Sequence, residues 1–267
     1  MADQVLISIE EGIAEVRLNR PEKRNALTLA LFDALTAAAE SLKARRDLRA
    51  VVLSGEGAAF CAGIDTSEFT RMATEAEATR AEMRAAAPGQ PNRFQRPVTA
   101  WADLDVPVIA ALQGVAFGAG FQLALGADFR IAAPGTQMSV MEARWGLIPD
   151  MGITQSLPRL MRADLAKELI LTARIFDAAE ALSLGLVTRL SDDPLKAARE
   201  MAAQFRSISP DVLRAGKRLV EEAWTAPRGQ GLTLEAEYQA QIIAGPNQIE
   251  AVMAGLQKRS PRFRDIG

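Results

Sequence analysis

One segment of the chain restricts the fold more than any other: residues 108–133 are almost wholly apolar, yet glycines interrupt them repeatedly. A proline stands directly before the segment at Pro107, and the segment contains Gln122, Asp128 and four glycines, Gly114, Gly118, Gly120 and Gly126. A helix that crosses a bilayer needs about 20 predominantly apolar residues with few or no charges. The segment therefore predicts a buried strand, a glycine-rich turn, a short helix and another strand, and no membrane span.

The rest of the chain alternates between strand-like and helix-like patterns. Val5–Ile9 and Ile13–Leu18 alternate apolar and polar residues around a Glu-Glu-Gly turn, which predicts a hairpin. Thr28 is placed to cap a helix that runs to about Arg45, and Arg49–Leu53 predicts a short buried strand. Strands that alternate with helices indicate an α/β layered core.

Two further stretches are predicted to be helical. Thr66–Ala87 is charged, ends at a Pro-Gly-Gln-Pro sequence, and is expected to form a mobile surface element. From Asp192 onward the strand patterns fade, and long helices are expected over Asp193–Arg206 and Asp211–Trp224. The C-terminal part of the chain should therefore be helical.

Composition excludes several classes of chemistry. The 267 residues include no histidine, which removes serine–histidine and cysteine–histidine nucleophiles and histidine-ligated zinc. A net charge of −2 without a long basic run disfavours a nucleic-acid partner. The single cysteine, Cys61, cannot form an internal disulfide, and the N-terminus lacks the basic-then-apolar order of a secretory signal. We expect a cytoplasmic protein with no metal, whose proton transfers use carboxylates, Lys, Tyr, Cys or water.

Two loops of small residues, Gly55–Asp65 and Gly114–Gln122, each follow a predicted strand and precede a predicted helix. Small residues allow a ligand to approach the backbone, and the first turn of a helix exposes unpaired N–H groups. Two such amides directed at one oxygen would form an oxyanion hole. Two alternatives are ordinary tight turns and a dinucleotide-binding turn at Gly118 and Gly120, although Leu123 replaces the third glycine of that pattern.

The two loops resemble those of the crotonase (enoyl-CoA hydratase/isomerase) superfamily. Residues 60–65, FCAGID, resemble its F-[CS]-A-G-x-D loop, and residues 114–122 resemble its G-x-A-x-G-G-G-x-[ED] loop. Residues 19–21 and 24–27 are similar to the family's N-terminal N-R-P and N-A-L stretches, and segments 146–149 and 178–187 also resemble it. The resemblance covers nearly the whole chain in order. It implies a spiral of repeated ββα units in residues 1–195, a helical trimerisation region in residues 196–267, and a homotrimer or a dimer of trimers.

The same resemblance implies an acyl-CoA substrate and an enolate intermediate held by the amides of Ala62 and Ala119. Alanine at 119 departs from the family's glycine triplet, but a backbone donor survives that change. Coenzyme A would enter as part of the substrate, and no tightly bound cofactor is expected. The implied binding residues are Lys23, Arg24, Ala26, Ala62, Gly63, Ile64, Asp65, Gly118, Gln122, Lys258 and Phe263.

The catalytic acids that the resemblance implies are Glu142 and Asp150. Hydratases of the family use two glutamates, and Gln122 occupies the position of the first, so only Glu142 remains of that pair. The family's dienoyl-CoA isomerases carry a glutamate and an aspartate at positions that match Glu142 and Asp150. The sequence therefore favours double-bond isomerisation, with hydration by Glu142 alone and a non-catalytic acyl-CoA-binding protein as alternatives. Without the resemblance, Asp150 could instead cap a helix, and Glu142 could pair with Arg144 or Arg130.

Overall fold

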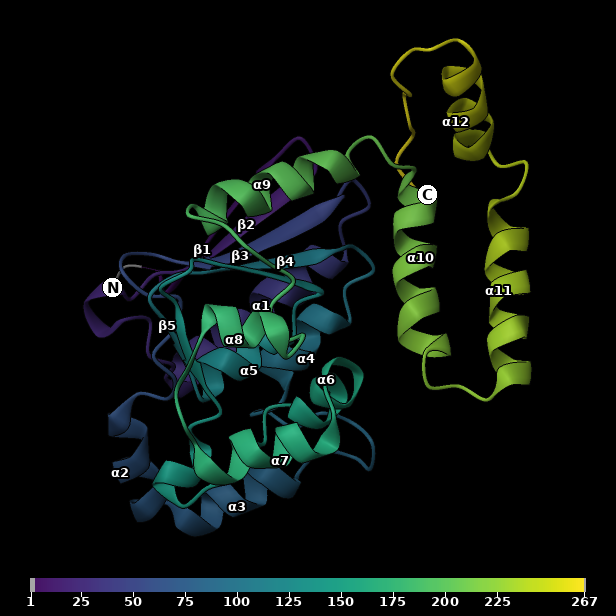
Figure 1. The fold of residues 1–267 in the computed structure, drawn as a ribbon. Helices are drawn as coiled ribbons and strands as arrows, with labels where there is room; N and C mark the ends of the chain where they lie inside the picture. Colours follow the sequence, from purple (N-terminus) through teal and green to yellow (C-terminus); the bar gives the residue numbers. More distant parts are fainter. Residues whose placement is uncertain (1–2, 267) are drawn as a thin grey trace.

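The computed structural model describes residues 3–266 and builds them around two β-sheets (Figure 1). The larger sheet has the strand order β1-β2-β3-β4-β6-β9. Its strands are Val5–Glu10, Ile13–Leu18, Ala50–Gly55, Val108–Leu112, Phe129–Ala132 and Arg189–Leu190. The smaller sheet, in the order β5-β7-β8, contains Val115–Phe117, Gln137–Ser139 and Phe176–Asp177. Only β1–β2 and β7–β8 are antiparallel, so the predicted hairpin and the α/β class are both confirmed.

Helices cover both faces of the larger sheet, and β3 shows how the sequence directs this. Val51 and Leu53 belong to the main apolar cluster, while Ala50 and Val52 pack on the opposite face. This alternation follows from the two-residue period of a strand. The main cluster packs against the helices α1 (Leu29–Lys43), α4 (Arg96–Ala102), α5 (Ala119–Leu125) and α8 (Ala178–Ser183).

The opposite face of the sheet is covered by α9 (Pro194–Phe205), which contributes Ala198, Met201 and Ala202 to the second cluster (Figure 1). The expected boundary at residues 195/196 therefore falls inside a helix that packs on the sheet. The part that stands apart from the core begins with α10 (Pro210–Ala223) and continues through α11 (Arg228–Ile242) and α12 (Pro246–Leu256).

Local signals explain several boundaries. The hydroxyl of Thr28 accepts from the Leu31 N–H, so this residue caps α1 as predicted. The charged stretch after Asp65 forms two short helices, α2 (Thr66–Thr74) and α3 (Ala76–Arg84). The predicted strand–turn–helix–strand of residues 108–133 is confirmed as β4, β5, α5 and β6. Within residues 3–266, no helix is both long enough and apolar enough to cross a membrane.

Polar contacts attach α10 to the core across a cleft of about 1620 Å³. The Lys217 ammonium lies 2.8 Å from the Asp128 carboxylate, and Arg159 forms an ion pair with Glu221. Arg214 donates to the carbonyl of Arg45 (3.2 Å). Neither of the predicted catalytic acids lines this cleft.

The remaining helical segments lie around the predicted site. A short 3-10 turn, η1 (Pro21–Lys23), follows β2, and a second, η2 (Glu142–Trp145), follows β7. The helices α6 (Ile153–Leu160) and α7 (Ala163–Thr172) come after η2 and precede β8.

Candidate active site

Two isolated bridges hold the first small-residue loop, between β3 and α2. In one bridge Cys61 faces Ala116. The Cys61 N–H donates to the Val115 carbonyl (3.0 Å), and the Phe117 N–H donates to the Cys61 carbonyl (3.1 Å). These hydrogen bonds join the first loop to β5, the strand that leads into the second loop.

The other bridge joins the first loop to Leu27, which faces Ile64. The Leu27 N–H donates to the Gly63 carbonyl (2.7 Å), and the Asp65 N–H donates to the Leu27 carbonyl (2.8 Å). In this parallel arrangement Leu27 uses both of its backbone groups, whereas Ile64 uses neither. Within residues 3–266, the Ile64 N–H has no hydrogen-bond acceptor and remains available to a ligand.

The prediction that Ala62 supplies an oxyanion-hole amide is wrong. Its N–H donates to the Arg24 carbonyl at 2.9 Å and is therefore already occupied. Arg24 and Asn25 both adopt the left-handed conformation, with φ of 48° and 56°, and this turn brings the carbonyl to the loop. The available amide of this loop is that of Ile64, two residues further along the chain.

The second loop presents the amide of Ala119, the first residue of α5. The first N–H groups of a helix lack intrahelical acceptors, and that of Ala119 has no partner in the described part of the chain. Gly118, which precedes it, has φ of +49° and ψ of −121°. Residues that carry a side chain rarely adopt this backbone conformation, so glycine at this position allows the chain to turn sharply into the helix.

The two loops pack directly against each other, which brings the Ile64 and Ala119 amides to the same region. A Cβ atom added to Gly63 would lie 2.7 Å from the Phe117 carbonyl oxygen and 3.9 Å from the Ala119 nitrogen. A Cβ atom added to Gly120 would lie 2.6 Å from the Cys61 carbonyl oxygen. The glycines are therefore required by the close approach of two backbones, and ordinary tight turns do not account for them.

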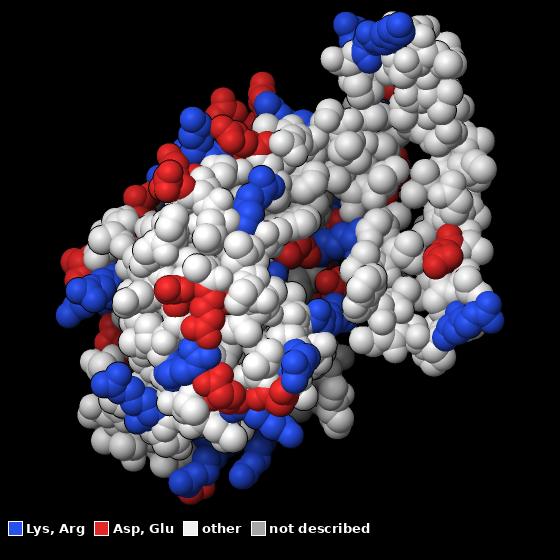
Figure 2. Space-filling model, viewed as in Figure 1, with Lys and Arg blue, Asp and Glu red and all other residues white. Residues whose placement is uncertain are grey.

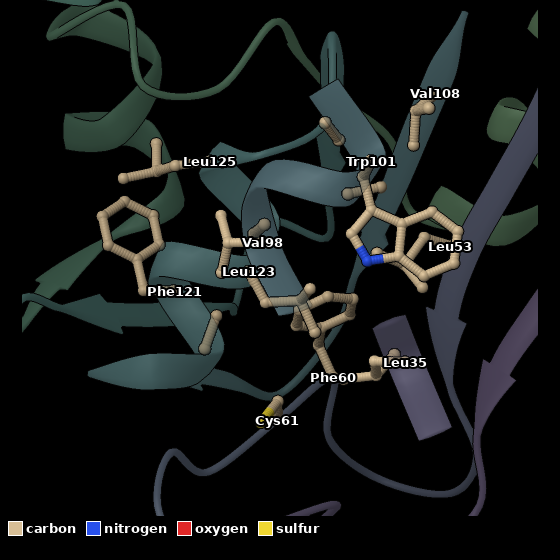
Figure 3. Packing of buried hydrophobic residues seen from close by; sticks show 14 of the residues in the cluster. Leu35, Leu53, Phe60, Cys61, Val98, Trp101, Val108, Phe121, Leu123 and Leu125 are labelled. Atoms are coloured by element: carbon tan, nitrogen blue, oxygen red, sulfur yellow. The ribbon is translucent and has the colours of Figure 1, made fainter. Parts of the chain in front are cut away.

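The main apolar cluster packs against these loops. Figure 3 shows Phe60, Leu35 and Trp101 pointing into the same buried cluster, with Cys61 at its edge. Burial raises the pKa of the Cys61 thiol to about 12, and the sulfur lies 3.1 Å from the Asn25 carbonyl oxygen. The thiol is thus protonated at neutral pH, and Cys61 is a small, fully buried residue of the core.

Asn25 is a supporting residue that the sequence analysis missed. Its side chain is fully buried, and its Nδ2 donates to the carbonyls of Glu56 (3.0 Å) and Ala59 (2.8 Å). Its Oδ1 accepts from the Arg20 N–H (2.9 Å). Asparagine tolerates the left-handed conformation better than most residues, and this preference is the one signal that could have drawn attention to it.

Two polar side chains, those of Glu142 and Gln122, meet beside Gly118. A Cβ atom added to Gly118 would lie 3.2 Å from Oε1 of Glu142. The Nε2 of Gln122 donates to the same oxygen at 2.7 Å, and the Met151 N–H donates to Oε1 of Gln122 at 2.9 Å. The structure therefore joins Glu142 through Gln122 to the residue that follows Asp150.

Burial governs the chemistry of both acids. It raises the pKa of Glu142 and that of Asp150 above their ordinary values. The charge of Asp150 raises the pKa of Glu142 further, which indicates that the two carboxyl groups lie near each other. The Oε2 atom of Glu142 is buried without a hydrogen-bond partner among the described residues. A buried carboxylate oxygen with no protein partner is typical of a group that acts on a ligand.

The structural alternatives for these acids do not hold. Helix α6 begins at Ile153, and its N-cap is Gly152, so Asp150 caps no helix. Arg130 donates to the carbonyls of Ala127 and Leu186. Across residues 3–266, Glu142 forms no ion pair with any arginine, so the predicted pairing with Arg144 or Arg130 is absent.

The predicted contacts to coenzyme A divide into two groups. Lys23 and Arg24 are exposed in the turn that abuts the first loop, and Ala26 follows them. Asp65 caps α2 by accepting from the Ser67 N–H (3.1 Å) and pairs with Arg20 at 3.1 Å. These positions surround the first loop, and of them Lys23 and Arg24 are exposed.

The roles of Lys258 and Phe263 in closing the site stay a prediction. The tail that carries them is attached to the core at the start of β3. The nearby Asp265 pairs with Arg49 at 2.6 Å, immediately before β3 begins. The active-site loop leaves the opposite end of this six-residue strand. The tail is also tied to α12, where the Arg264 N–H donates to the Asn247 side chain (2.8 Å).

An aromatic pair borders the candidate site. The rings of Phe69 in α2 and Trp145 in η2 lie 5.2 Å apart. Phe69 lies in the helix that follows the first loop, and Trp145 lies in the same 3-10 turn as Glu142. The pair therefore connects α2 with η2. Leu147 and Ile148, between the two acids, are exposed and extend this apolar border.

Comparisons with known proteins agree with the fold. The family model described as enoyl-CoA hydratase/isomerase matches residues 8–266. Methylglutaconyl-CoA hydratase of Mus musculus is 32% identical over 261 residues, which cover 95% of this chain and 80% of that protein. Enoyl-CoA hydratase domain-containing protein 2 of Homo sapiens is 34% identical over 267 residues, covering 97% of this chain and 88% of that protein.

Solved structures give the same result. The enoyl-CoA hydratase of Bacillus anthracis superposes with a TM-score of 0.89 at 30% identity, covering 98% of this chain and 99% of that one. An enoyl-CoA hydratase from a Polaromonas species gives 0.88 at 31% identity, with coverage of 97% and 99%. The chain therefore belongs to the enoyl-CoA hydratase/isomerase, or crotonase, family, as predicted, and the dinucleotide-binding alternative is excluded.

Proposed function

We propose that the protein isomerises double bonds in an acyl-CoA thioester, using Glu142 and Asp150 as paired proton carriers. The observations that support this proposal most directly are the raised pKa values of Glu142 and Asp150 and the position of Glu142 Oε1 beside Gly118, the residue that precedes the Ala119 amide. Carboxyl groups whose pKa values are raised by burial are suited to exchange protons with a substrate.

The proposed reaction balances without water. One carboxylate removes a proton from C2 of a 3,5-dienoyl thioester, and the electron pair moves onto the thioester oxygen. The amides of Ile64 and Ala119 stabilise the negative charge there. The electrons then return through the conjugated chain, C6 takes a proton from the other carboxyl group, and the product is the 2,4-dienoyl thioester.

Hydration by Glu142 alone is the second candidate, and the named relatives favour it, since those reported above carry the word hydratase. Against it, Gln122 cannot accept a proton at neutral pH, and its amide is already engaged with Glu142 and Met151. A single carboxyl group would therefore have to activate the water and deliver the proton.

The test is a panel of 3,5-dienoyl-CoA and 2-enoyl-CoA thioesters with the wild type, Glu142→Gln and Asp150→Asn. Isomerisation requires that the wild type produce the conjugated 2,4-diene and that both substitutions abolish it. Full activity of Asp150→Asn together with inactivity of Glu142→Gln would instead indicate a one-acid hydratase. Binding without turnover on the whole panel would indicate an acyl-CoA-binding protein.

Deuterium exchange at C2 then assigns the two roles. In heavy water the group that removes the C2 proton also returns deuterium to that carbon. The variant that keeps C2 exchange but forms no product has lost the group that protonates C6. A variant that loses both exchange and product has lost the base.

We also propose that the chain assembles as a trimer through α10–α12. Several apolar side chains of these helices are exposed in the single chain, and Figure 2 shows few charged side chains on the face of this region that is in view. They include Val220, Trp224, Leu232, Ile249, Val252 and Leu256. Sedimentation equilibrium measures the mass directly, and a 28.7 kDa monomer at micromolar concentration would contradict the proposal.

A further inference from the structure

Gln122 has a buried side chain whose amide is used at both ends. It is 1% exposed, and its Nε2 donates to Glu142 while its Oε1 accepts from the Met151 N–H. The first contact fixes one oxygen of the carboxylate, and the second fixes the backbone next to Asp150. One side chain therefore connects the two segments that carry the acids.

An amide is the only group of this shape that can make both contacts at neutral pH. A carboxylate in its place could still accept from the Met151 N–H, but it would present an oxygen to Glu142 at about hydrogen-bond distance. Two carboxylates that close must share a proton. The group between the acids therefore determines whether Glu142 is ionised.

We propose that Gln122 is a positioning residue that keeps Glu142 ionised and oriented, and that holds the Asp150 segment against the same substrate chain. The role in catalysis rests on the proposed isomerisation, whereas the effect on Glu142 does not depend on which reaction is catalysed. Burial and the charge of Asp150 both oppose ionisation of Glu142, and the donated hydrogen bond from Gln122 acts in the other direction.

The rival explanation is that Gln122 only fills space in the core. Volume and polarity can be separated, because methionine has a similar length and no hydrogen-bonding amide. Gln122→Met removes the hydrogen bond to Glu142 and keeps the packing. Gln122→Glu keeps the shape and introduces a proton that the two carboxyl groups must share.

The experiment titrates Glu142 in the unliganded protein with ¹³C-labelled glutamate carboxyl groups, and identifies the signal by its loss in Glu142→Gln. We expect the pKa of Glu142 to rise by about one to two pH units in Gln122→Met, since a hydrogen bond to a charged group is lost. Gln122→Glu should give two coupled titrations in place of one. Gln155→Met, an exposed substitution in α6, is the control and should change nothing.

Turnover provides the second readout. The limb of the pH–rate profile that Glu142 sets should move to higher pH in Gln122→Met by the same interval as the titration. An unchanged Glu142 titration in a folded Gln122→Met protein would overturn the inference. If Gln122→Met does not fold, a single unperturbed Glu142 titration in Gln122→Glu overturns it. Failure of the wild type to isomerise any dienoyl thioester would reject the proposed function but leave the titration test intact.

Discussion

Gly120 offers the sharpest test of the packing that brings the two loops together. An added methyl group would lie 2.6 Å from both the carbonyl oxygen and the sulfur of Cys61. Ordinary contact requires about 3.4 Å or more, so the loops would have to separate by roughly 0.8 Å. The Cys61 carbonyl is held by the Phe117 N–H at 3.1 Å, so it cannot move without loss of that hydrogen bond.

We expect Gly120→Ala to lower the free energy of unfolding by about 1–3 kcal/mol, the usual cost of overpacking. Because the Ile64 and Ala119 amides are carried by the loops that separate, kcat on the preferred thioester should fall about 100- to 1000-fold, the cost of losing one oxyanion donor. Urea unfolding and steady-state kinetics measure the two effects. Gly135→Ala is the matched control, since a Cβ atom there has no neighbour within 4 Å.

Removing the sulfur relieves one of the clashes. Cys61→Ala in the Gly120→Ala background removes the contact with Sγ but leaves those with the carbonyl oxygen (2.6 Å) and the Cβ atom (2.7 Å) of Cys61, so stability should return in part and activity should remain low. Wild-type stability and activity of Gly120→Ala itself would refute the conclusion that the two backbones are in direct contact.

Three further outcomes follow from the structure. Gly216→Ala should stabilise the protein by up to about 1 kcal/mol in urea unfolding, because the residue lies inside α10 and an added Cβ atom has no neighbour within 4 Å. Lys217→Met should destabilise it by about 3–5 kcal/mol by leaving the Asp128 carboxylate buried without its partner, and Asp128→Asn in the same chain should restore much of the loss. Glu142→Gln should be more stable than the wild type near neutral pH, and the difference should vanish below about pH 4. The reason is that burial raises the pKa of Glu142 in the folded state above its ordinary value of 4.5. The folded wild type therefore loses stability as the pH rises from the unfolded-state pKa to the folded-state pKa. Urea unfolding of both proteins across this pH range measures the difference in stability. A difference that stays constant with pH would contradict the prediction.

Local patterns were sufficient for much of the fold. The hydroxyl of Thr28, the alternation in the first two strands, and the glycines of residues 108–133 each predicted an element that the structure contains. Each of these signals concerns residues that are close in sequence, where propensity and spacing determine the outcome. The position of the Ala119 amide at the start of α5 is also a local property.

The error at Ala62 concerns a contact between distant parts of the chain. Nothing in residues 55–65 indicates that the Arg24 carbonyl accepts the Ala62 N–H. The position of that carbonyl depends on a left-handed turn about 40 residues earlier in the chain. Likewise, the attachment of the tail through Asp265 to Arg49 depends on how α10–α12 dock on the sheet. Spacing within a motif does not carry this information.

The two bridges of the first loop have a consequence for how the loop can change in length. Along residues 61–65, the Cys61 N–H donates to the Val115 carbonyl, while the Gly63 carbonyl and the Asp65 N–H bond to Leu27 and the Ile64 N–H has no acceptor among residues 3–266. Inserting or deleting a single residue would shift this register and turn a carbonyl outward where the Ile64 N–H stands now. Substitutions of side chains in this loop should therefore be tolerated far better than any change of one residue in its length.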